Sequence, residues 1–142
     1  MNQSNKYCES LTKYLRRKSR VVHIGDVPLG GDYPVRVQSM TTTDTMNTQA
    51  TVEQSIRMIK AGCEYVRITA PSIKEAQNLA NIKQQLRQQG YTTPLIADIH
   101  FTPNAALEAA RIVEKVRINP GNFADRKKFQ EIEYTDKSYN DE

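Results

Sequence analysis

Short apolar runs alternate with longer segments of helical periodicity along most of the chain. The runs are rich in Val and Ile and are bounded by Gly, Pro or Thr, which predicts strands at 35–40, 65–69, 94–99 and 115–118. Between them, apolar residues recur every three or four positions, which predicts helices at 51–61, 72–89 and 103–113. Gly62 and Gly90 follow the first two helices, where glycine commonly ends a helix. The predicted order is strand, helix, strand, helix, strand, helix, strand.

Two further elements are predicted before this alternation. Apolar and aromatic residues recur at helical spacing over 6–17, which predicts an N-terminal helix. Two short apolar runs flank the turn Gly25-Asp26, which predicts a β-hairpin over 21–29. The predicted organisation is an N-terminal helix, a partial barrel containing four strands and a charged tail, at 1–20, 21–123 and 124–142.

Strands that alternate with helices pair in parallel through right-handed crossovers, which leaves two architectures. A doubly wound dinucleotide-binding sheet is not favoured, because no Gly-x-Gly-x-x-Gly follows a strand. Polar residues two apart, such as Asp98 and His100, flank the last residues of the strands and share a face. In a barrel that face lies at the carboxyl mouth, where barrel enzymes place their chemistry. We therefore predict an α/β fold, the first half of a TIM-type (β/α)8 barrel preceded by a short N-terminal helix and a β-hairpin.

The composition is typical of a folded globular protein. Charged residues make up 25% of the chain and hydrophobic residues 38%. No apolar run approaches the roughly 18 residues that a membrane span needs, and the first residues lack the apolar stretch of a secretory signal. We therefore expect a cytoplasmic location and no membrane partner.

The net charge of +4 raises the question of nucleic-acid binding, and basic residues gather at 16–20. No aromatic-interleaved recognition motif accompanies them, so we expect no nucleic-acid partner. Cys8 and Cys63 form no Cys-x-x-Cys pair and have no histidine at metal-ligand spacing. We therefore expect two reduced thiols and no metal or cofactor within this segment.

Charged side chains at the strand ends form the candidate site. Arg67 and Arg117 each carry a planar fork of donors that binds phosphate or carboxylate bidentately. Two such groups on neighbouring or next-neighbour strands suit a diphosphate. The alternative is an inward ion pair between these arginines and Asp98, without a ligand.

His100 shares a face with Asp98, and a nearby carboxylate favours an imidazolium that donates from both nitrogens. His100 is then a phosphate donor or a general acid, and the alternative is a hydrogen-bonded loop histidine. After Arg117, Pro120 fixes one backbone angle and Gly121 permits a positive φ. This predicts a sharp turn that directs the amides of Asn119 and Asn122 at one point, unless the turn only closes the strand.

Neutral groups end the first strand. Gln38, Met40 and the threonines at 41–43 could hydrogen-bond a ligand, although helix capping explains the threonines nearly as well. No catalytic residue is assigned with certainty in this segment. The predicted substrate-binding set is Gln38, Met40, Arg67, Asp98, His100, Arg117, Asn119 and Asn122.

Taken together, four ordered strings resemble the N-terminal region of the 4-hydroxy-3-methylbut-2-enyl diphosphate synthase family over residues 16–123. They are Val35-Arg-Val-Gln-Ser-Met-Thr, Tyr65-Val-Arg-Ile-Thr, Ala97-Asp-Ile-His-Phe and Val116-Arg-Ile-Asn-Pro-Gly-Asn. Four motifs in order are far more specific than any single one.

The resemblance implies an iron–sulfur oxidoreductase of the non-mevalonate isoprenoid pathway. In that family a barrel binds 2-C-methyl-D-erythritol 2,4-cyclodiphosphate, a C-terminal domain carries a [4Fe–4S] cluster, ferredoxin or flavodoxin supplies electrons, and the protein is a homodimer. By motif, Asp98 is a ligand or an orienting partner of His100, and the diphosphate-binding groups are Arg67, His100, Arg117 and Asn119.

The sequence departs from the family pattern in two respects. Only four of the eight strands are present, and neither cysteine lies in a cluster motif. We therefore expect this fragment to keep ligand-binding groups and to have no turnover alone. Two alternatives stay open: a pterin-binding barrel of the dihydropteroate synthase type, and a non-catalytic half-barrel that pairs with itself.

Overall fold

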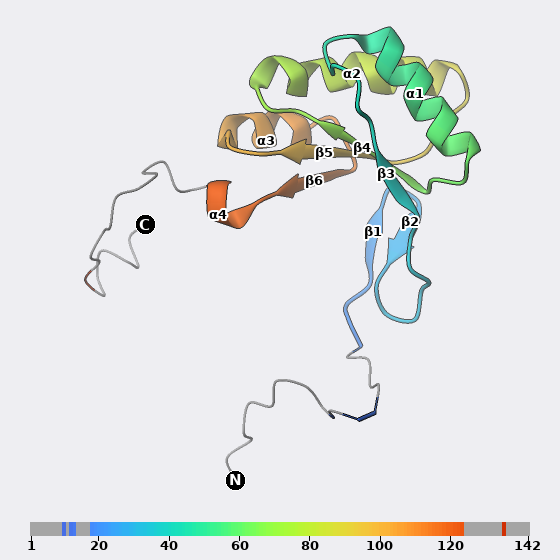
Figure 1. The fold of residues 1–142 in the computed structure, drawn as a ribbon, viewed down its shortest axis with the longest axis vertical. Coiled ribbons are helices and arrows are strands. Elements are labelled where there is room, and N and C mark those ends of the chain that lie inside the picture. The colour runs from blue at the N-terminus through green and yellow to red at the C-terminus, as the bar shows by residue number, and fades with distance from the viewer. Residues whose placement is uncertain (1–9, 11, 14–17, 124–134, 136–142) are drawn as a thin grey trace.

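Figure 1 shows the fold of the computed structural model, which describes residues 10, 12, 13, 18–123 and 135, with only the backbone described at Asn122. The elements are β1 (Val22–Ile24), β2 (Val27–Leu29), β3 (Gln38–Met40), α1 (Thr48–Lys60), β4 (Tyr65–Thr69), α2 (Ile73–Gln88), β5 (Leu95–Ile99), α3 (Pro103–Ala110), β6 (Lys115–Ile118) and α4 (Pro120–Phe123). No helix among the described residues is long and apolar enough to cross a membrane.

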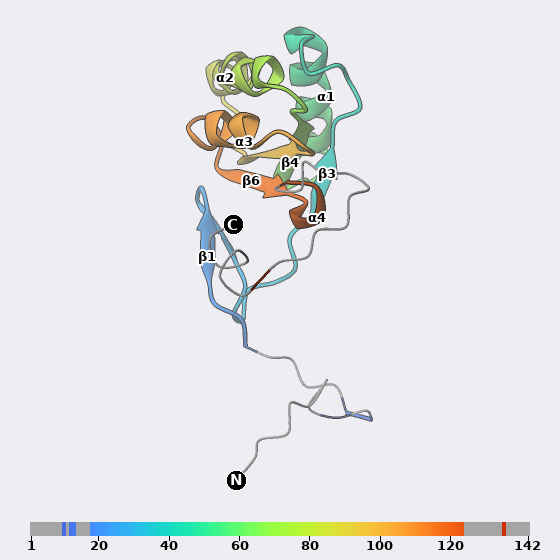
Figure 2. The same ribbon diagram turned by 90° about the vertical axis from the view of Figure 1, so that its left-hand side faces the viewer.

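The four strands β3 to β6 form one parallel sheet in chain order, β3-β4-β5-β6. The three connecting helices α1, α2 and α3 all lie on one face of this sheet, as Figure 2 shows. A doubly wound sheet would carry helices on both faces. Consecutive strand order with helices on one face is the arrangement of the wall of a barrel, so the predicted half-barrel is confirmed.

The outer face of the sheet forms the main core with the helices. Alternate residues of the strands point to this face and are fully buried against the apolar side of α2. The helix contributes Leu79, Ile82 and Leu86. Their partners in β4 and β5 are Val66, Ile68, Leu95, Ala97 and Ile99. Burial of each large aliphatic side chain contributes about 1.5–3 kcal/mol, so this layer supplies most of the hydrophobic stabilisation of the fold.

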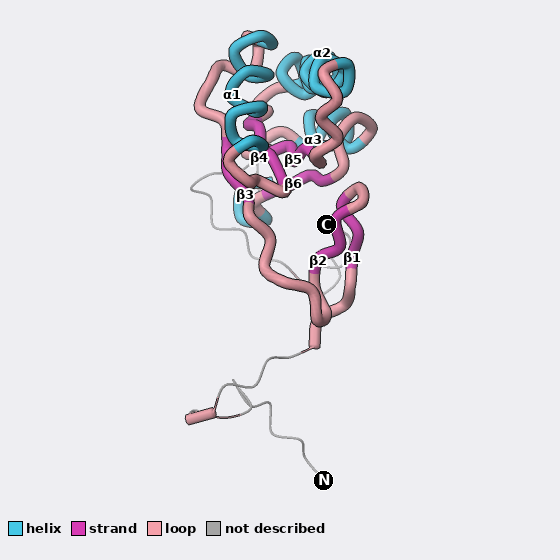
Figure 3. The backbone as a smooth tube through the Cα atoms, turned by 90° about the vertical axis from the view of Figure 1, so that its right-hand side faces the viewer, coloured by secondary structure: helices cyan, strands magenta, loops and turns pink. Residues whose placement is uncertain are grey.

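The antiparallel hairpin β1–β2 lies on the opposite, inner face of the sheet, near the amino ends of the strands (Figure 3). Ile24 packs there against Tyr65 and Ile96 in a second, smaller apolar cluster. The Tyr65 hydroxyl donates to the Val27 carbonyl oxygen at 3.2 Å, and burial raises the pKa of Tyr65. The predicted hairpin is confirmed, and it occupies the amino-terminal end of the inner face.

Arg36 fastens the hairpin to the sheet. Its Nε donates to the Pro28 carbonyl oxygen at 2.8 Å, and its Nη1 donates to Glu64 at 2.7 Å. The second Glu64 oxygen accepts from the Val37 N–H at 2.8 Å. The hydrogen bonds from Val37 and then Arg36 lower the pKa of Glu64. Because the hairpin is held at the amino end, the polar residues at the carboxyl end stay accessible.

Several predicted boundaries shift. The first strand is Gln38–Met40 rather than 35–40, because Val35 and Val37 are 77% and 55% exposed and only the Val37 carbonyl joins the sheet, through the N–H groups of Glu64 and Tyr65. The first helix begins at Thr48, where the Asn47 side chain accepts from the Ala50 N–H. The third helix ends at Ala110 rather than 113, where bonds to the third preceding carbonyl tighten its last turn.

Most of the helix predicted over 6–17 lies outside the described residues. At the three residues that are described, Ser10, Thr12 and Lys13, the prediction is wrong. The Ser10 hydroxyl accepts from the N–H groups of Thr12 and Lys13, a local pairing that competes with helical bonds. The charged tail predicted over 124–142 also lies outside the described residues, apart from Thr135.

Glu114, just before β6, ties the helical layer to the sheet. Its carboxylate accepts from Lys83 at 2.9 Å, from Arg87 at 3.1 Å and from the Leu95 N–H at 2.8 Å. Burial on its own would raise the pKa of Glu114, but the hydrogen bonds from Lys83 and Leu95 outweigh it and hold the pKa below its ordinary range. The ionised carboxylate therefore stabilises the fold, at every pH at which it is deprotonated.

This contribution should make stability depend on pH. Because the folded pKa lies below the unfolded value of about 4.3, the stabilisation is complete above that pH and is lost as the pH falls through the folded pKa. Urea unfolding followed by circular dichroism should show the Glu114→Gln variant losing less stability on acidification than the parent. Glu53→Gln, on the exposed side of α1, removes the same charge as a control. Equal acid sensitivity of the parent and Glu114→Gln would contradict this assignment.

Candidate functional site

The strand register brings the predicted charged residues side by side on the inner face. Met40 pairs with Arg67 across β3 and β4, and Thr69 pairs with Asp98 across β4 and β5. Asp98 in turn pairs with Arg117 across β5 and β6. Residues two apart on a strand share a face, so these side chains meet near the carboxyl ends of the strands, as the sequence predicts.

Asp98 is the centre of this group. Its Oδ1 lies 3.1 Å from Arg117 Nη1, and its Oδ2 lies 3.5 Å from Arg67 Nε and 3.6 Å from His100 Nε2. We call these four residues the Asp98 cluster. The two oxygens of the Asp98 carboxylate therefore face two guanidinium groups and one imidazole, which come from β4, β6 and the end of β5.

The Asp98 cluster carries more positive than negative charge. Two guanidinium groups face one carboxylate, and a protonated His100 would add a further positive charge. The Asp98 side chain is 4% exposed, whereas those of Arg67, His100 and Arg117 are 30%, 40% and 43% exposed. Arg117 Nη2 and both terminal nitrogens of Arg67 make no hydrogen bond within the described part of the chain. Within that part of the chain, Asp98 does not use every donor of the two arginines, so an anion could bind beside it.

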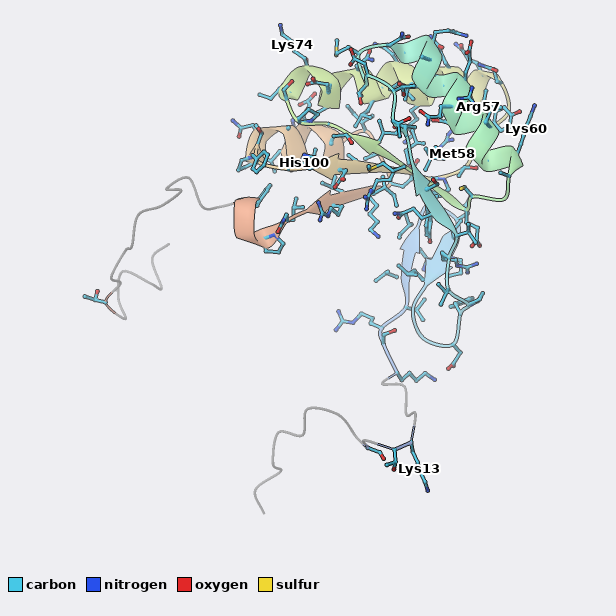
Figure 4. The ribbon with its side chains drawn as sticks, in the orientation of Figure 1. Lys13, Arg57, Met58, Lys60, Lys74 and His100 are labelled. Carbon is cyan, nitrogen blue, oxygen red and sulfur yellow. The ribbon has the colours of Figure 1, made fainter. Side chains whose placement is uncertain are left out.

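His100 lies just beyond the end of β5, where the chain turns toward α3 (Figure 4). Its ring meets that of Phe101 edge to face, with the centroids 5.9 Å apart. With Asp98 near Nε2 and Phe101 beside it, the imidazole is oriented from two sides. This arrangement suits a group that donates to a ligand oxygen.

Met40 joins the group through its sulfur. Arg67 Nε donates to Met40 Sδ at 3.2 Å, and the Thr69 hydroxyl lies 3.9 Å from the same atom. Thr69 is absent from the predicted set, although it lies two residues after Arg67 on the same face. The alternation of the strand was the signal that could have found it.

Gln38 does not join the Asp98 cluster. It lies two residues nearer the amino end of β3 than Met40 and lines a cavity of about 620 Å³ between the hairpin segment and the sheet. Tyr65, Arg36 and Lys115 line the same cavity. Sequence reasoning missed Lys115, which lies two residues before Arg117 on the inner face, so the same alternation could have found it.

The segment after Arg117 is not the sharp turn that was predicted. Residues 120–123 form the short helix α4, and Gly121 does not adopt a positive φ. The Asn119 side-chain oxygen accepts from the Gly121 N–H at 3.3 Å, so the asparagine serves its own helical turn. No hydrogen bond joins Asn119 to the Asp98 cluster among the described residues. The side chain of Asn122 lies outside what the structure describes.

The threonines after β3 bond to β4 and to the middle of α1 and do not cap α1. Gln54 Oε1 accepts from the N–H groups of Thr42 and Thr43 at 3.0 and 3.2 Å. The cap is Asn47, so the capping interpretation of 41–43 is wrong. The Thr41 hydroxyl is buried and has no hydrogen-bond partner among the described residues.

The described residues do not fit an iron–sulfur cluster. Such a cluster needs several cysteine thiolates, and Cys63 is a free thiol with no group of three potential metal ligands around it or elsewhere in the described part of the chain. Cys8 lies outside the described residues. The described residues therefore do not supply the ligands of such a cluster.

Comparison with known proteins decides the family. The family model described as the GcpE TIM-barrel domain matches residues 19–140. The chain belongs to this family. Membership in the GcpE family agrees with the barrel architecture and with the family resemblance of the four motifs, and it decides against the dihydropteroate synthase type.

Relatives of this GcpE chain include 4-hydroxy-3-methylbut-2-en-1-yl diphosphate synthases from several organisms. The flavodoxin-type protein of Parabacteroides distasonis is 61% identical over 127 residues, 89% of this chain and 21% of its own length. That of Leptospira interrogans is 52% identical over 137 residues, 96% of this chain and 21% of its own length. The ferredoxin-type, chloroplastic protein of Oryza sativa is 49% identical over 138 residues, 96% of this chain and 18% of its own length. The chain spans about a fifth of the length of these relatives.

Proposed function

We propose that this chain is the diphosphate-binding part of a 4-hydroxy-3-methylbut-2-en-1-yl diphosphate synthase of the non-mevalonate isoprenoid pathway. The observation that carries the proposal is the Asp98 cluster, which presents two arginines and a histidine at the carboxyl ends of neighbouring barrel strands. Relatives with that printed name are 49–61% identical to the chain. The substrate in this proposal is 2-C-methyl-D-erythritol 2,4-cyclodiphosphate, which the whole enzyme converts reductively.

In this proposal Arg67, His100 and Arg117 bind oxygens of the diphosphate. Each guanidinium offers donors that Asp98 leaves unused, and charge-assisted hydrogen bonds to phosphate are about twice as strong as neutral ones. Asn119 contributes its amide N–H groups, since its oxygen accepts from Gly121. Asn122, Met40 and Gln38 complete the proposed set at the edges of the site.

The whole enzyme supplies what this chain lacks. We infer that a [4Fe–4S] cluster held outside the described residues carries the electron transfer, with flavodoxin or ferredoxin as donor and a homodimer as the working assembly in the cytoplasm. The chain alone is then a ligand-binding unit without turnover.

Calorimetric titration of the 142-residue chain tests the proposal. Saturable binding of the cyclic diphosphate and of inorganic pyrophosphate is expected, with no binding of a pterin. Product formation is not expected when reduced flavodoxin or ferredoxin is added. Failure to bind either diphosphate would overturn the proposed binding role. Turnover by the chain alone would overturn the proposal that the chain binds the ligand without converting it. Sedimentation of the same samples tests the remaining alternative, because a stable dimer that binds no diphosphate would support a self-pairing half-barrel.

A further inference from the structure

We propose that Asp98 is a positioning residue, which sets the orientation of the anion-binding groups and does not itself contact the ligand. This inference rests on the proposed function, because it concerns how the same site holds a diphosphate. It separates one residue of the predicted binding set from the others and gives it a different role.

The first argument is accessibility. The Asp98 side chain is 4% exposed, while each of the three groups around it is at least 30% exposed. Both of its oxygens already face nitrogen atoms, Oδ1 facing Arg117 and Oδ2 facing Arg67 and His100. A ligand that enters from solvent therefore meets the basic groups before it meets the carboxylate.

The second argument is charge. A carboxylate beside a phosphate is repulsive, so an anion site built for charge alone would omit it. A long arginine side chain loses rotational freedom when it is fixed, a cost of up to about 2 kcal/mol for each side chain. A carboxylate held by the β5 backbone fixes two arginines before the ligand arrives, which lowers the entropy lost on binding.

The third argument is the origin of the groups. Arg67 comes from β4, His100 follows β5, and Arg117 comes from β6. No two of these three are linked directly by a hydrogen bond or ion pair among the described residues. Asp98, on the central strand, is the one member of the cluster that contacts all three.

Simple electrostatics and positioning predict opposite signs for Asp98→Asn. Removal of a negative charge from an anion site should tighten binding, whereas loss of orientation should weaken it. We expect Asp98→Asn to bind inorganic pyrophosphate about tenfold more weakly than the parent chain, in line with the sensitivity of such sites to small misplacements. Asp32→Asn makes the same chemical change at an exposed side chain in the segment after β2. It should change affinity by less than about twofold.

A double-mutant cycle shows whether Asp98 acts through its neighbours. If it does, Asp98→Asn should have a smaller effect when Arg67 or Arg117 is already glutamine. Additive losses in both backgrounds would mean that Asp98 contacts the ligand directly and would overturn the proposal. Unchanged or tighter binding by Asp98→Asn would also overturn it.

Two further measurements keep the test decisive. Where Asp98→Asn does not fold, Asp98→Glu keeps the charge and displaces it by one methylene, and full affinity in that variant would contradict positioning. Where the parent chain binds no pyrophosphate, the proposed function fails, yet nuclear magnetic resonance of the arginine Nε–H groups still tests Asp98. Ordered signals of Arg67 and Arg117 should lose order in the Asp98 variant, and unchanged order would overturn the inference.

Discussion

Replacement of Arg117 by glutamine is expected to lower the affinity of the chain for inorganic pyrophosphate roughly 10- to 100-fold, the range for loss of hydrogen bonds to a charged group. Arg117 is the most exposed member of the Asp98 cluster and uses Nη1 for Asp98 at 3.1 Å, which leaves other donors of its fork for the ligand. Calorimetric titration at fixed ionic strength measures the change.

Two companion variants separate geometry from charge. Arg117→Lys keeps the positive charge but loses the planar fork, so we expect most of the loss to persist. Arg111→Gln removes the same charge from a side chain that is 74% exposed, at the residue after α3. It should leave affinity within about twofold, because exposed charges are screened. Equal losses in Arg111→Gln and Arg117→Gln would mean that net charge, and not the site, attracts the anion.

Leu79→Ala is expected to destabilise the fold by about 2–5 kcal/mol, the range for a buried leucine that leaves a cavity. Leu79 is 0% exposed and lies in α2 against the outward face of the sheet. Because small domains are stable by only about 5–15 kcal/mol in total, this single change removes a large share. Urea unfolding followed by circular dichroism measures it.

Leu107→Ala gives the matched control for that core prediction. It makes the same chemical change in α3 at a side chain that is 62% exposed, and its effect should stay within about 0.5 kcal/mol. Similar losses in the two variants would contradict the difference in burial between Leu79 and Leu107.

The position of the charged side chains depends on the packing of the core on the other face of the same strands. Ala97 and Ile99 point outward into the helical layer, while Asp98 between them points inward. A slip of one residue in the β5 register would turn Asp98 into the apolar core and expose its neighbours. Packing of the outer face therefore fixes the position of the charged groups on the inner face.

The local pattern of the sequence was sufficient to predict most elements of the sheet and its helices. Alternating apolar positions placed β4 and β6 at their observed bounds, and Gly62 and Gly90, both at positive φ, ended α1 and α2 as expected. The spacing of Arg67, Asp98 and Arg117 near strand ends was enough to predict that they meet. These features depend on residues close together in the chain.

Other predictions failed where the residue types permit more than one pattern of hydrogen bonds. Pro120 and Gly121 permit a turn, yet Gly121 instead belongs to α4, with Asn119 accepting its N–H. The threonines at 41–43 could have capped a helix, but the side chain of Gln54, within α1, accepts from the N–H groups of Thr42 and Thr43. In both places side-chain oxygens accept backbone N–H groups, and these hydrogen bonds accompany the conformation that is observed.

The sequence by itself determined the order of strands and helices, the inward face of each strand and the family. Only the tertiary structure decided that one carboxylate contacts both arginines and His100, that Gln38 lies apart from them, and that the hairpin occupies the amino end. The physical reason is register: periodicity fixes which way a side chain points, whereas the neighbour that it meets depends on how separate strands align, and packing across the whole sheet sets that alignment.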